Sequence, residues 1–459
     1  MTSIWTVEFC VKAHVPECTG TLADVGVSDP ARVLVISMSD LARDPRVDRQ
    51  IEFLSEEFEV VAAGFGPPRQ DIEFHRFDGT IPDPEIPEPE VGDGPVLGPG
   101  EGGPSATELV RRTAARAVVS SGNFVYWRSF RARRVIAPYP RRYWMDTIYL
   151  HQARQLLGIQ ADLAVVNDAW FLPIERAIGQ GRPVVFDAHE YAPSEHVANL
   201  VWRIENGPIA RAICRHEIPR LAGMMTVSPG LVDAYHDLCG VEAELVTSAP
   251  WFEDLEPRPL EGRRVRMVHW GGADPQRRLE VMIDAMALLD ERFSLDMILV
   301  PGVSDYITAL TQRAAGDPRI RFLEPVPMPE LARFGNAYDV GLYPLPPLHI
   351  NQQFALPNKF FEFVQARLAV AIGPSPDMAH IARQHDFGIL SEDVSPASVA
   401  SALRTLTPER LWALKCNAHA AAHELSAEHN TEIVRDLVRR ALTHPAPGIA
   451  SIHRPHGAP

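Results

Sequence analysis

The sequence predicts two doubly wound α/β domains that face each other across a cleft. Two series of short, β-branched apolar runs alternate with helical stretches, one starting at Arg32 and the other near Arg264. Such alternation is typical of parallel sheets that are covered by helices. The length of 459 residues also exceeds that of one ordinary domain and suits two domains of roughly 200 residues each.

In the first series, the run RVLVISMS at 32–39 predicts a buried parallel strand. A helix is expected next, because Val47, Ile51 and Leu54 fall at helical spacing, and a second strand is expected at EVVAAGF. After a helical stretch over 106–155, three more strands are expected at ADLAVVND, RPVVFDAHE and GMMTVS. Strand, helix and strand in succession indicate a βαβ unit.

In the second series, VRMVHW and LDMILVPG are expected to be strands on either side of a helix over QRRLEVMIDAMALLDER. Further strands are expected at IRFLEP, DVGLYPL, LAVAIG and GILS, with a helix from Pro357. Ligands of such sheets bind beyond the carboxyl ends of the strands. The cleft between the two domains is therefore the expected site.

The domain boundaries are predicted from shifts in composition. We expect a disordered tail over 1–30, a first domain over 31–252, a linker over 253–262, a second domain over 263–425, a C-terminal helix over 426–443 that can return to the first domain, and a tail over 444–459. Residues 81–105 are rich in Pro, Gly, Asp and Glu, which predicts an exposed insert.

Charge and hydropathy argue against several classes of protein. A net charge of −15 argues against a general nucleic-acid binder, which needs a basic face. No apolar run reaches the ~20 residues that span a bilayer, and the N-terminus lacks the basic and then apolar pattern of a signal peptide. We therefore expect a cytoplasmic protein, with peripheral contact at the inner membrane face left open. Five cysteines without CxxC spacing predict reduced, structural thiols.

Three expected helix starts combine a proline with a cation in the first turn. They are DPR at 44–46, DPQRR at 274–278 and LPNK at 356–359. A cation is disfavoured there, because the helix dipole is positive at this end. An anion docked on the free backbone N–H groups would explain it. A diphosphate held in the second domain, near Gly271 and Gly272, is one interpretation, and solvated surface arginines are the other.

Lys359 stands out because the chain has 44 basic residues, of which only Lys12, Lys359 and Lys415 are lysines. Lysine is a compact point charge, and arginine is not equivalent to it. Glu362 lies three residues further along, on the same helix face. If Lys359 meets a phosphate, Glu362 can accept hydrogen bonds from a ribose diol. A simple ion pair within the helix is the alternative.

The segment FDAHEYAPSEH places Asp187, His189 and Glu190 at the carboxyl end of a strand, where they can face the cleft. A structural role for His189 is the alternative to a functional one. His189 and His196 do not have HExxH spacing, and no Asp-x-Asp pair follows a strand. A bound divalent metal is therefore not expected.

Residues 106–155 also interleave arginines with aromatic residues, which suits an anionic lipid surface or an acidic acceptor. An arginine-faced helical pair that packs on its own domain is the alternative. The residues concerned are Arg111, Arg112, Arg116, Arg128, Arg131, Arg133, Arg134, Arg141 and Arg142, with Phe124, Tyr126, Trp127, Phe130, Tyr139, Tyr143 and Trp144.

From about Arg32 to Leu403 the chain resembles glycosyltransferase family 4 and its retaining GT-B relatives. The resemblance rests on DPRVDRQIEFL, FDAHEYAPSE, MMTVSPGLVDAY, HWGGADPQRRLEVMIDAM, IRFLEPVPMPEL, YDVGLYPL and ALPNKFFEFVQA, in that order. It implies the GT-B fold, with two Rossmann-like domains across a cleft. It also implies sugar transfer from a nucleotide-diphosphate sugar, with retention and without a metal.

The resemblance further implies a role for each candidate residue. The donor, a UDP or GDP sugar, would be bound by Gly271, Gly272, Arg277, Asn358, Lys359 and Glu362, with no separate cofactor. The implied catalytic residues are His189, Lys359 and Arg277, with His189 at the sugar hydroxyls or the reacting centre. No paired carboxylates for a double displacement are evident. Positioning and charge stabilisation would then carry catalysis. The acceptor is expected to be a small molecule, a glycan or a lipid-linked saccharide.

One departure from the family pattern concerns the donor sugar. The family has a glutamate eight residues before the one that matches Glu362, and this chain has Phe354 there. Asn351 or Gln352 can substitute for it. Two other functions stay open. A sugar-nucleotide epimerase of GT-B fold would need several acids and histidines around the sugar, and a catalytically silent GT-B partner subunit is kept open by Phe354.

Overall fold

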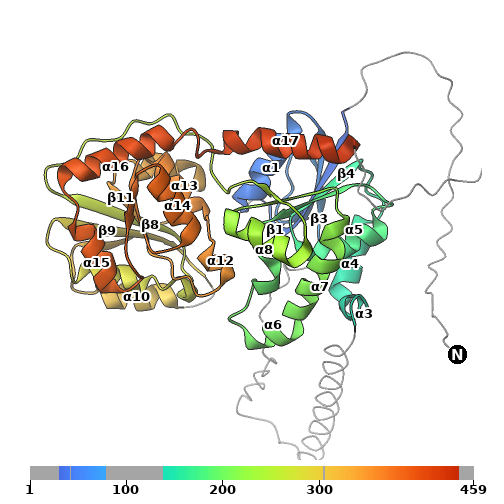
Figure 1. Ribbon diagram of the computed structural model, residues 1–459, viewed down its shortest axis with the longest axis horizontal. Coiled ribbons are helices and arrows are strands. Elements are labelled where there is room, and N and C mark those ends of the chain that lie inside the picture. Colours follow the sequence, from blue (N-terminus) through green and yellow to red (C-terminus); the bar gives the residue numbers. More distant parts are fainter. Residues whose placement is uncertain (1–29, 42, 79–137, 303–304, 444–459) are drawn as a thin grey trace, which may run out of the picture.

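The computed structural model describes residues 30–41, 43–78, 138–302 and 305–443. Within these ranges the chain forms two parallel sheets with their helices, which lie side by side as two domains (Figure 1). The predicted pair of doubly wound α/β domains is therefore confirmed.

The first sheet has the strand order β3-β2-β1-β4-β5-β6-β7, and each neighbouring pair is parallel. Its strands are β1 (Arg32–Asp40), β2 (Glu59–Phe65), β3 (Glu73–Arg76), β4 (Leu163–Val166), β5 (Val184–Ala188), β6 (Gly223–Thr226) and β7 (Glu244–Leu245). Its helices are α1 (Pro45–Ser55), α3 (Arg141–Trp144), α4 (Thr147–Leu156), α5 (Leu172–Ile178), α6 (Leu200–Glu205), α7 (Gly207–Glu217) and α8 (Pro229–Cys239). The order reverses between β1 and β4, which is where such sheets bind ligands.

The second sheet has the order β10-β9-β8-β11-β12-β13, again with parallel neighbours. Its strands are β8 (Val265–Gly272), β9 (Phe293–Val300), β10 (Ile320–Leu323), β11 (Val340–Tyr343), β12 (Ala369–Ile372) and β13 (Gly388–Leu390). The helices that follow are α9 (Glu280–Met286), α10 (Tyr306–Ala314), α11 (Leu331–Gly335), α12 (Ile350–Gln353), α13 (Asn358–Gln365), α14 (Pro376–Gln384), α15 (Pro396–Arg404), α16 (Pro408–Ala421) and α17 (Ala427–Thr443). Its order reverses between β8 and β11.

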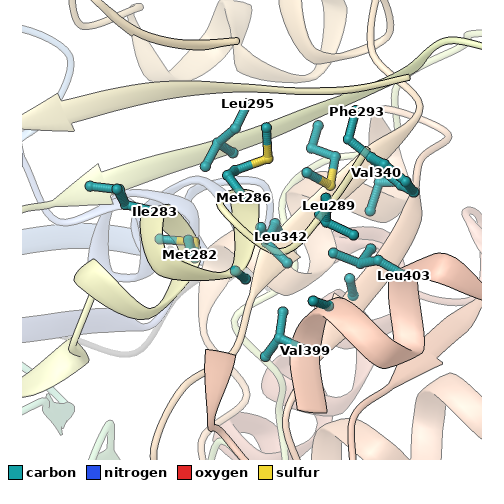
Figure 2. Packing of buried hydrophobic residues seen from close by; sticks show 14 of the residues in the cluster. Met282, Ile283, Met286, Leu289, Phe293, Leu295, Val340, Leu342, Val399 and Leu403 are labelled. Carbon is teal, nitrogen blue, oxygen red and sulfur yellow. The ribbon is translucent and has the colours of Figure 1, made fainter. Parts of the chain in front are cut away.

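Each sheet has an apolar layer on both faces, because successive residues of a strand point to opposite sides. In β1, Leu34 and Ile36 enter one cluster, while Val33 and Val35 enter the other. In the second domain, Figure 2 shows Met282 and Met286 of α9 packed with Leu342 and other side chains of one layer. Burial on both faces explains why these strands read as nearly continuous apolar runs.

The last helix, α17, follows the second domain in sequence but packs against α1 of the first (Figure 1). Leu437 joins the core cluster beside β1, and Arg439 pairs with Glu57 at 2.6 Å. Within the described ranges the chain therefore crosses between the domains twice. The two crossings meet where Ala427 N donates a hydrogen bond to Pro250 O at 2.8 Å.

The helix expected over 276–292 is shorter than predicted. The segment after β8 forms a single 3-10 turn, Pro275–Arg277, in which Asp274 accepts a hydrogen bond from Gln276 N at 2.9 Å. Arg278 then has a φ of +51°, in the left-handed region, which ends the turn before α9 begins. The Asp-Pro capping pattern at 274–275 therefore begins a single turn here and not a long helix.

Residues 79–137 lie outside the described residues, and with them the insert expected at 81–105 and most of the segment rich in arginine and aromatic residues. The part that is described packs on its own domain. Arg142 is buried and donates to the carbonyl oxygen of Ile204 at 3.2 Å, and the hydroxyl of the buried Tyr143 donates to Trp170 O at 2.5 Å. Across the described ranges, no helix combines the length and apolar character that a bilayer crossing demands.

Candidate functional site

A cleft of about 520 Å³ lies between the two domains, beyond the carboxyl ends of strands from both sheets. The first domain lines it with His189 and Glu190, which follow β5. The second domain lines it with Arg277 after β8, Tyr343 at the end of β11 and Asn358 at the start of α13. This volume suits a small-molecule ligand.

Lys359 is a buried cation that forms no hydrogen bond or ion pair within the described residues. The residue is only 6% exposed, and its Nζ atom has no hydrogen-bond partner. The Nζ atom lies 4.4 Å from the centre of the Tyr343 ring. Burial lowers the pKa of Lys359 well below its ordinary value, the charge of Arg277 lowers it further, and Glu362 opposes both. Because an unpaired buried charge is costly, this ammonium is suited to receive an anion.

Gly271 lets the Lys359 side chain approach the backbone of β8. A Cβ atom at Gly271 would lie 2.6 Å from Lys359 Nζ and 3.8 Å from Arg277 Nη1. Its φ of +124° is also one that residues with side chains rarely adopt. The fold thus brings three predicted site residues together, with the cations Lys359 and Arg277 next to Gly271. Gly272 differs, because a Cβ atom there would meet nothing within 4 Å.

Glu362 is not paired with Lys359, so the alternative of a simple ion pair within the helix is wrong. Its Oε2 atom accepts a hydrogen bond from Trp270 Nε1 at 2.7 Å. Burial raises the pKa of Glu362, against the opposing effects of Trp270, Lys359 and Arg49. The indole therefore fixes one carboxylate oxygen, and Oε1 takes part in no hydrogen bond within the described ranges.

Besides Lys359 Nζ, a ring nitrogen of His269 in β8 is buried without a hydrogen-bond partner among the described residues. Its Nδ1 atom donates to Leu342 O at 2.8 Å, while Nε2 has no hydrogen-bond partner among the residues that the structure describes. Burial and then the charge of Lys359 lower the pKa of His269 well below its ordinary value. The ring is therefore neutral, and Nε2 is an acceptor. Sequence reasoning missed His269, because it lies inside a run that reads as an apolar strand.

Arg46, the first-turn cation of α1, has a protein carboxylate as its anion. The buried guanidinium meets Asp187, with Nη2 at 2.6 Å from Oδ1 and Nε at 2.9 Å from Oδ2. Burial raises the pKa of Asp187, but Arg46 and His189 outweigh it and lower that pKa to about 2. Two expectations are corrected here: Arg46 is not available to a ligand, and Asp187, which is 1% exposed, does not face the cleft.

Removing Arg46 should destabilise the protein strongly. We expect Arg46→Met to lower the free energy of unfolding by about 3 kcal/mol, because Asp187 would be left buried without its partner. The double variant Arg46→Met/Asp187→Asn should recover part of this loss. Urea unfolding followed by circular dichroism measures both. A single variant as stable as the wild type would contradict this account of the pair.

His189 is held in the cleft by a hydrogen-bonded network. Its Nε2 atom donates to Asn167 Oδ1 at 3.0 Å, and Asn167 Nδ2 donates to Gln50 Oε1 at 2.9 Å. Burial disfavours the charged ring, but Asp187, whose Oδ2 lies 3.6 Å from Nε2, prevails, and the pKa of His189 is raised. The side chain is 26% exposed. It is therefore both structurally anchored and accessible from the cleft.

Acidic side chains gather near His189, and sequence reasoning missed two of them. Glu195 lines the cleft with Glu190 and accepts a hydrogen bond from Trp170 Nε1 at 3.4 Å. Burial, with Glu190 and Asp168 adding to it, raises the pKa of Glu195 to about 8. Asp168 follows the carboxyl end of β4. The strand-end signal that marked His189 also applied to Asp168.

No family model and no curated protein sequence matches this chain. Solved structures do match it. Sucrose-phosphate synthase of Thermosynechococcus elongatus aligns with a TM-score of 0.63 over 90% of this chain and 99% of its own, at 13% identity. HepE of Anabaena, in complex with UDP-glucose, aligns with a TM-score of 0.58 over 89% and 99%, at 12% identity. The chain has the GT-B fold.

A further GT-B match is the E. coli trehalose-6-phosphate structure bound with UDP-2-fluoro glucose. It has a TM-score of 0.57 over 89% of this chain and 99% of its own, at 13% identity. At these identities the likeness shows the GT-B fold alone, and it does not single out family 4 within it. The candidate site of this chain lies in the cleft between the two GT-B domains.

Proposed function

We propose that the protein is a glycosyltransferase, which moves a sugar from a nucleotide-diphosphate sugar to an acceptor. The observation that carries the proposal is the buried, unpartnered ammonium of Lys359, beside Arg277 and Gly271. Two cations that form no ion pair within the described ranges suit a diphosphate. The structures of HepE with UDP-glucose and of the E. coli protein with UDP-2-fluoro glucose, both with this fold, support a UDP sugar as the donor. A GDP sugar is the other candidate donor.

In the proposed reaction, the bond between the anomeric carbon and the diphosphate oxygen breaks, and a bond from that carbon to an acceptor oxygen forms. Lys359 and Arg277 stabilise the charge that develops on the departing diphosphate. Asn358 lies next to the phosphates, Glu362 accepts hydrogen bonds from the ribose hydroxyls, and His189 contacts the sugar. The acceptor attacks from the face of the leaving group, and a phosphate oxygen takes its proton, so the configuration is retained.

We also propose that neither a metal nor a further cofactor is required, because Lys359 and Arg277 supply the positive charge that a metal would bring. The acceptor belongs to the class of small molecules, glycans or lipid-linked saccharides. The cytoplasm remains the proposed location. Because Arg142 and Tyr143 are buried in their own domain, a contact with an anionic membrane is proposed only for the part of the arginine- and aromatic-rich segment that lies outside the described residues.

The test is a panel of UDP and GDP sugars incubated with purified full-length protein and candidate acceptors. We expect release of nucleoside diphosphate that depends on an acceptor, at the same rate with and without EDTA. A rate that is lost on chelation and restored by Mg²⁺ or Mn²⁺ would overturn the metal-independent part. A folded protein that releases nucleoside diphosphate from no donor would overturn the proposed function.

A second candidate is a sugar-nucleotide epimerase of GT-B fold, and one observation favours it. Such an enzyme would need acids and histidines around the sugar, and the cleft is lined by His189, Glu190, Glu195 and His196. The same panel without any acceptor distinguishes the two. An epimerase converts the donor sugar into an isomer, which NMR detects. A transferase leaves the sugar unchanged until an acceptor is added.

A further inference from the structure

The segment 348–358 of the second domain is docked on the first domain. It contains α12, which lies beside α8 of the first domain (Figure 1). It also forms much of the cleft wall, with His349, Asn351, Phe354 and Asn358 among the lining residues. The same short segment thus contacts the opposite domain and leads directly into Lys359.

Phe354 makes the apolar part of this contact together with Ile350 of α12. Its ring packs against the hydrophobic core cluster of the first domain, although the residue belongs to the second. It also covers Gly230, in the first turn of α8, so closely that a Cβ atom at Gly230 would lie 2.0 Å from Phe354 Cδ1. The absence of a side chain at Gly230 provides the space that the ring occupies.

Hydrogen bonds between the domains accompany this apolar contact. Gly230 N donates to Asp377 Oδ2 of α14 at 3.0 Å. In α12, Asn351 Oδ1 accepts from Tyr191 N at 2.8 Å, and Asn351 Nδ2 donates to Glu190 Oε2 at 3.2 Å. Asn351 therefore binds the first domain with both atoms of its amide. These contacts hold segment 348–358 in place, and they exist only when the two domains touch.

We infer that Phe354 is a positioning residue: by docking segment 348–358 on the first domain, it holds Asn358 and Lys359 where they bind the donor. The inference deepens the proposed function and rests on it for the identity of the ligand. The contact itself does not depend on that function. It also gives a physical reason for the departure from the family pattern. A glutamate at 354 would bring a carboxylate to the place where Gly230 already receives the carboxylate of Asp377.

The test compares Phe354→Ala, Phe354→Leu and Phe354→Glu with the wild type. The affinity for UDP and GDP is measured by calorimetry, and the radius of gyration without ligand is measured by small-angle X-ray scattering. We expect Phe354→Ala to raise the Kd of the bound nucleotide about tenfold, because fewer molecules hold the competent arrangement, and to increase the radius of gyration. Phe354→Leu should recover part of both. Phe354→Glu, although it restores the family residue, should bind no better than Phe354→Ala.

Two further variants serve as controls. Phe322→Ala removes a partly buried phenylalanine from β10 that packs only on the core of the second domain, and it should leave the Kd and the radius of gyration unchanged. Gly230→Ala places a methyl group where the ring lies and should reproduce Phe354→Ala from the other domain. It also serves if Phe354→Ala does not fold.

The outcomes separate the inference from the proposed function. An unchanged Kd and radius of gyration in folded Phe354→Ala or Gly230→Ala would overturn the positioning role. Tighter nucleotide binding by Phe354→Glu would also overturn it, and would show that a carboxylate is what the site lacks. A wild type that binds neither nucleotide would contradict the proposed donor, while the radius of gyration would still test the contact between the domains.

Discussion

Replacement of Lys359 with alanine should lower kcat by about 10²–10³, which is the usual loss when one contact to developing charge is removed. The ammonium is buried, forms no hydrogen bond within the described ranges and lies 4.4 Å from the Tyr343 ring, so all of its N–H groups are available to the diphosphate. Lys359→Arg should restore activity only in part, because a planar, delocalised guanidinium is not equivalent to a compact ammonium. Steady-state kinetics with the true donor and acceptor measures both variants.

The same position should respond in the opposite direction when stability is measured. Lys359→Met should raise the free energy of unfolding of the unliganded protein by about 1 kcal/mol or more, because a buried charge without a partner is removed. Lys415 is the matched control. It is buried as well, but its Nζ atom donates to Tyr338 O at 2.7 Å and Asp339 Oδ1 at 3.1 Å. Lys415→Met should therefore destabilise the protein. A loss of stability in both variants, or near-normal turnover of folded Lys359→Ala, would remove Lys359 from the proposed site.

Gly271→Ala should lower kcat/KM for the donor about 10²-fold, similar to the loss of one contact to the diphosphate. The added Cβ atom would lie 2.6 Å from Lys359 Nζ and 3.1 Å from its Cε, so the ammonium must leave its position. The φ of +124° adds backbone strain, which costs about 1–3 kcal/mol. The two effects need separate controls, because strain alone can also reduce activity.

Gly316→Ala isolates the effect of strain. Gly316 also has a positive φ, of +96°, but a Cβ atom there would meet nothing within 4 Å, and the residue lies between α10 and β10. We expect Gly316→Ala to lose stability and to keep its turnover. Thermal unfolding and donor kinetics of both variants provide the comparison. Equal activity in the two variants would contradict the close approach of Lys359 to Gly271.

The fold could be predicted from the sequence because a strand that is buried on both faces has an almost continuous apolar sequence. Strands such as β1 and β2 read as unbroken apolar runs, and the structure places them within a residue or two of their expected ends. The edge strand β3 was missed, because Glu73–Arg76 alternates charged, aromatic and imidazole side chains and has few buried atoms. Both results have one cause, because the apolar content of a strand reflects how much of that strand is buried.

The site could be predicted only in part, because local patterns do not show distant partners. Arg46 and Arg277 follow the same Asp-Pro pattern, yet Asp187, which is 141 positions further along the chain, neutralises Arg46 in the fold. The rarity of lysine pointed to Lys359 of α13, but the surroundings of its ammonium depend on Gly271 of β8 and Tyr343 of β11, which are distant in the sequence. Tertiary contacts, and not the spacing of residues in the sequence, distinguish the structural cation Arg46 from the candidate binding cation Lys359.

The most direct test of the role of Lys359 is a crystal structure of the protein with a bound nucleoside diphosphate, UDP or GDP, grown in the presence of EDTA. We expect the diphosphate in the cleft between the domains, with its oxygens within hydrogen-bonding distance of Lys359 Nζ and the Arg277 guanidinium, and lying against Gly271. Glu362 should then face the ribose. A nucleotide bound elsewhere, or one whose phosphates do not meet Lys359, would contradict the central claim that this buried ammonium is the anion-binding centre of the site.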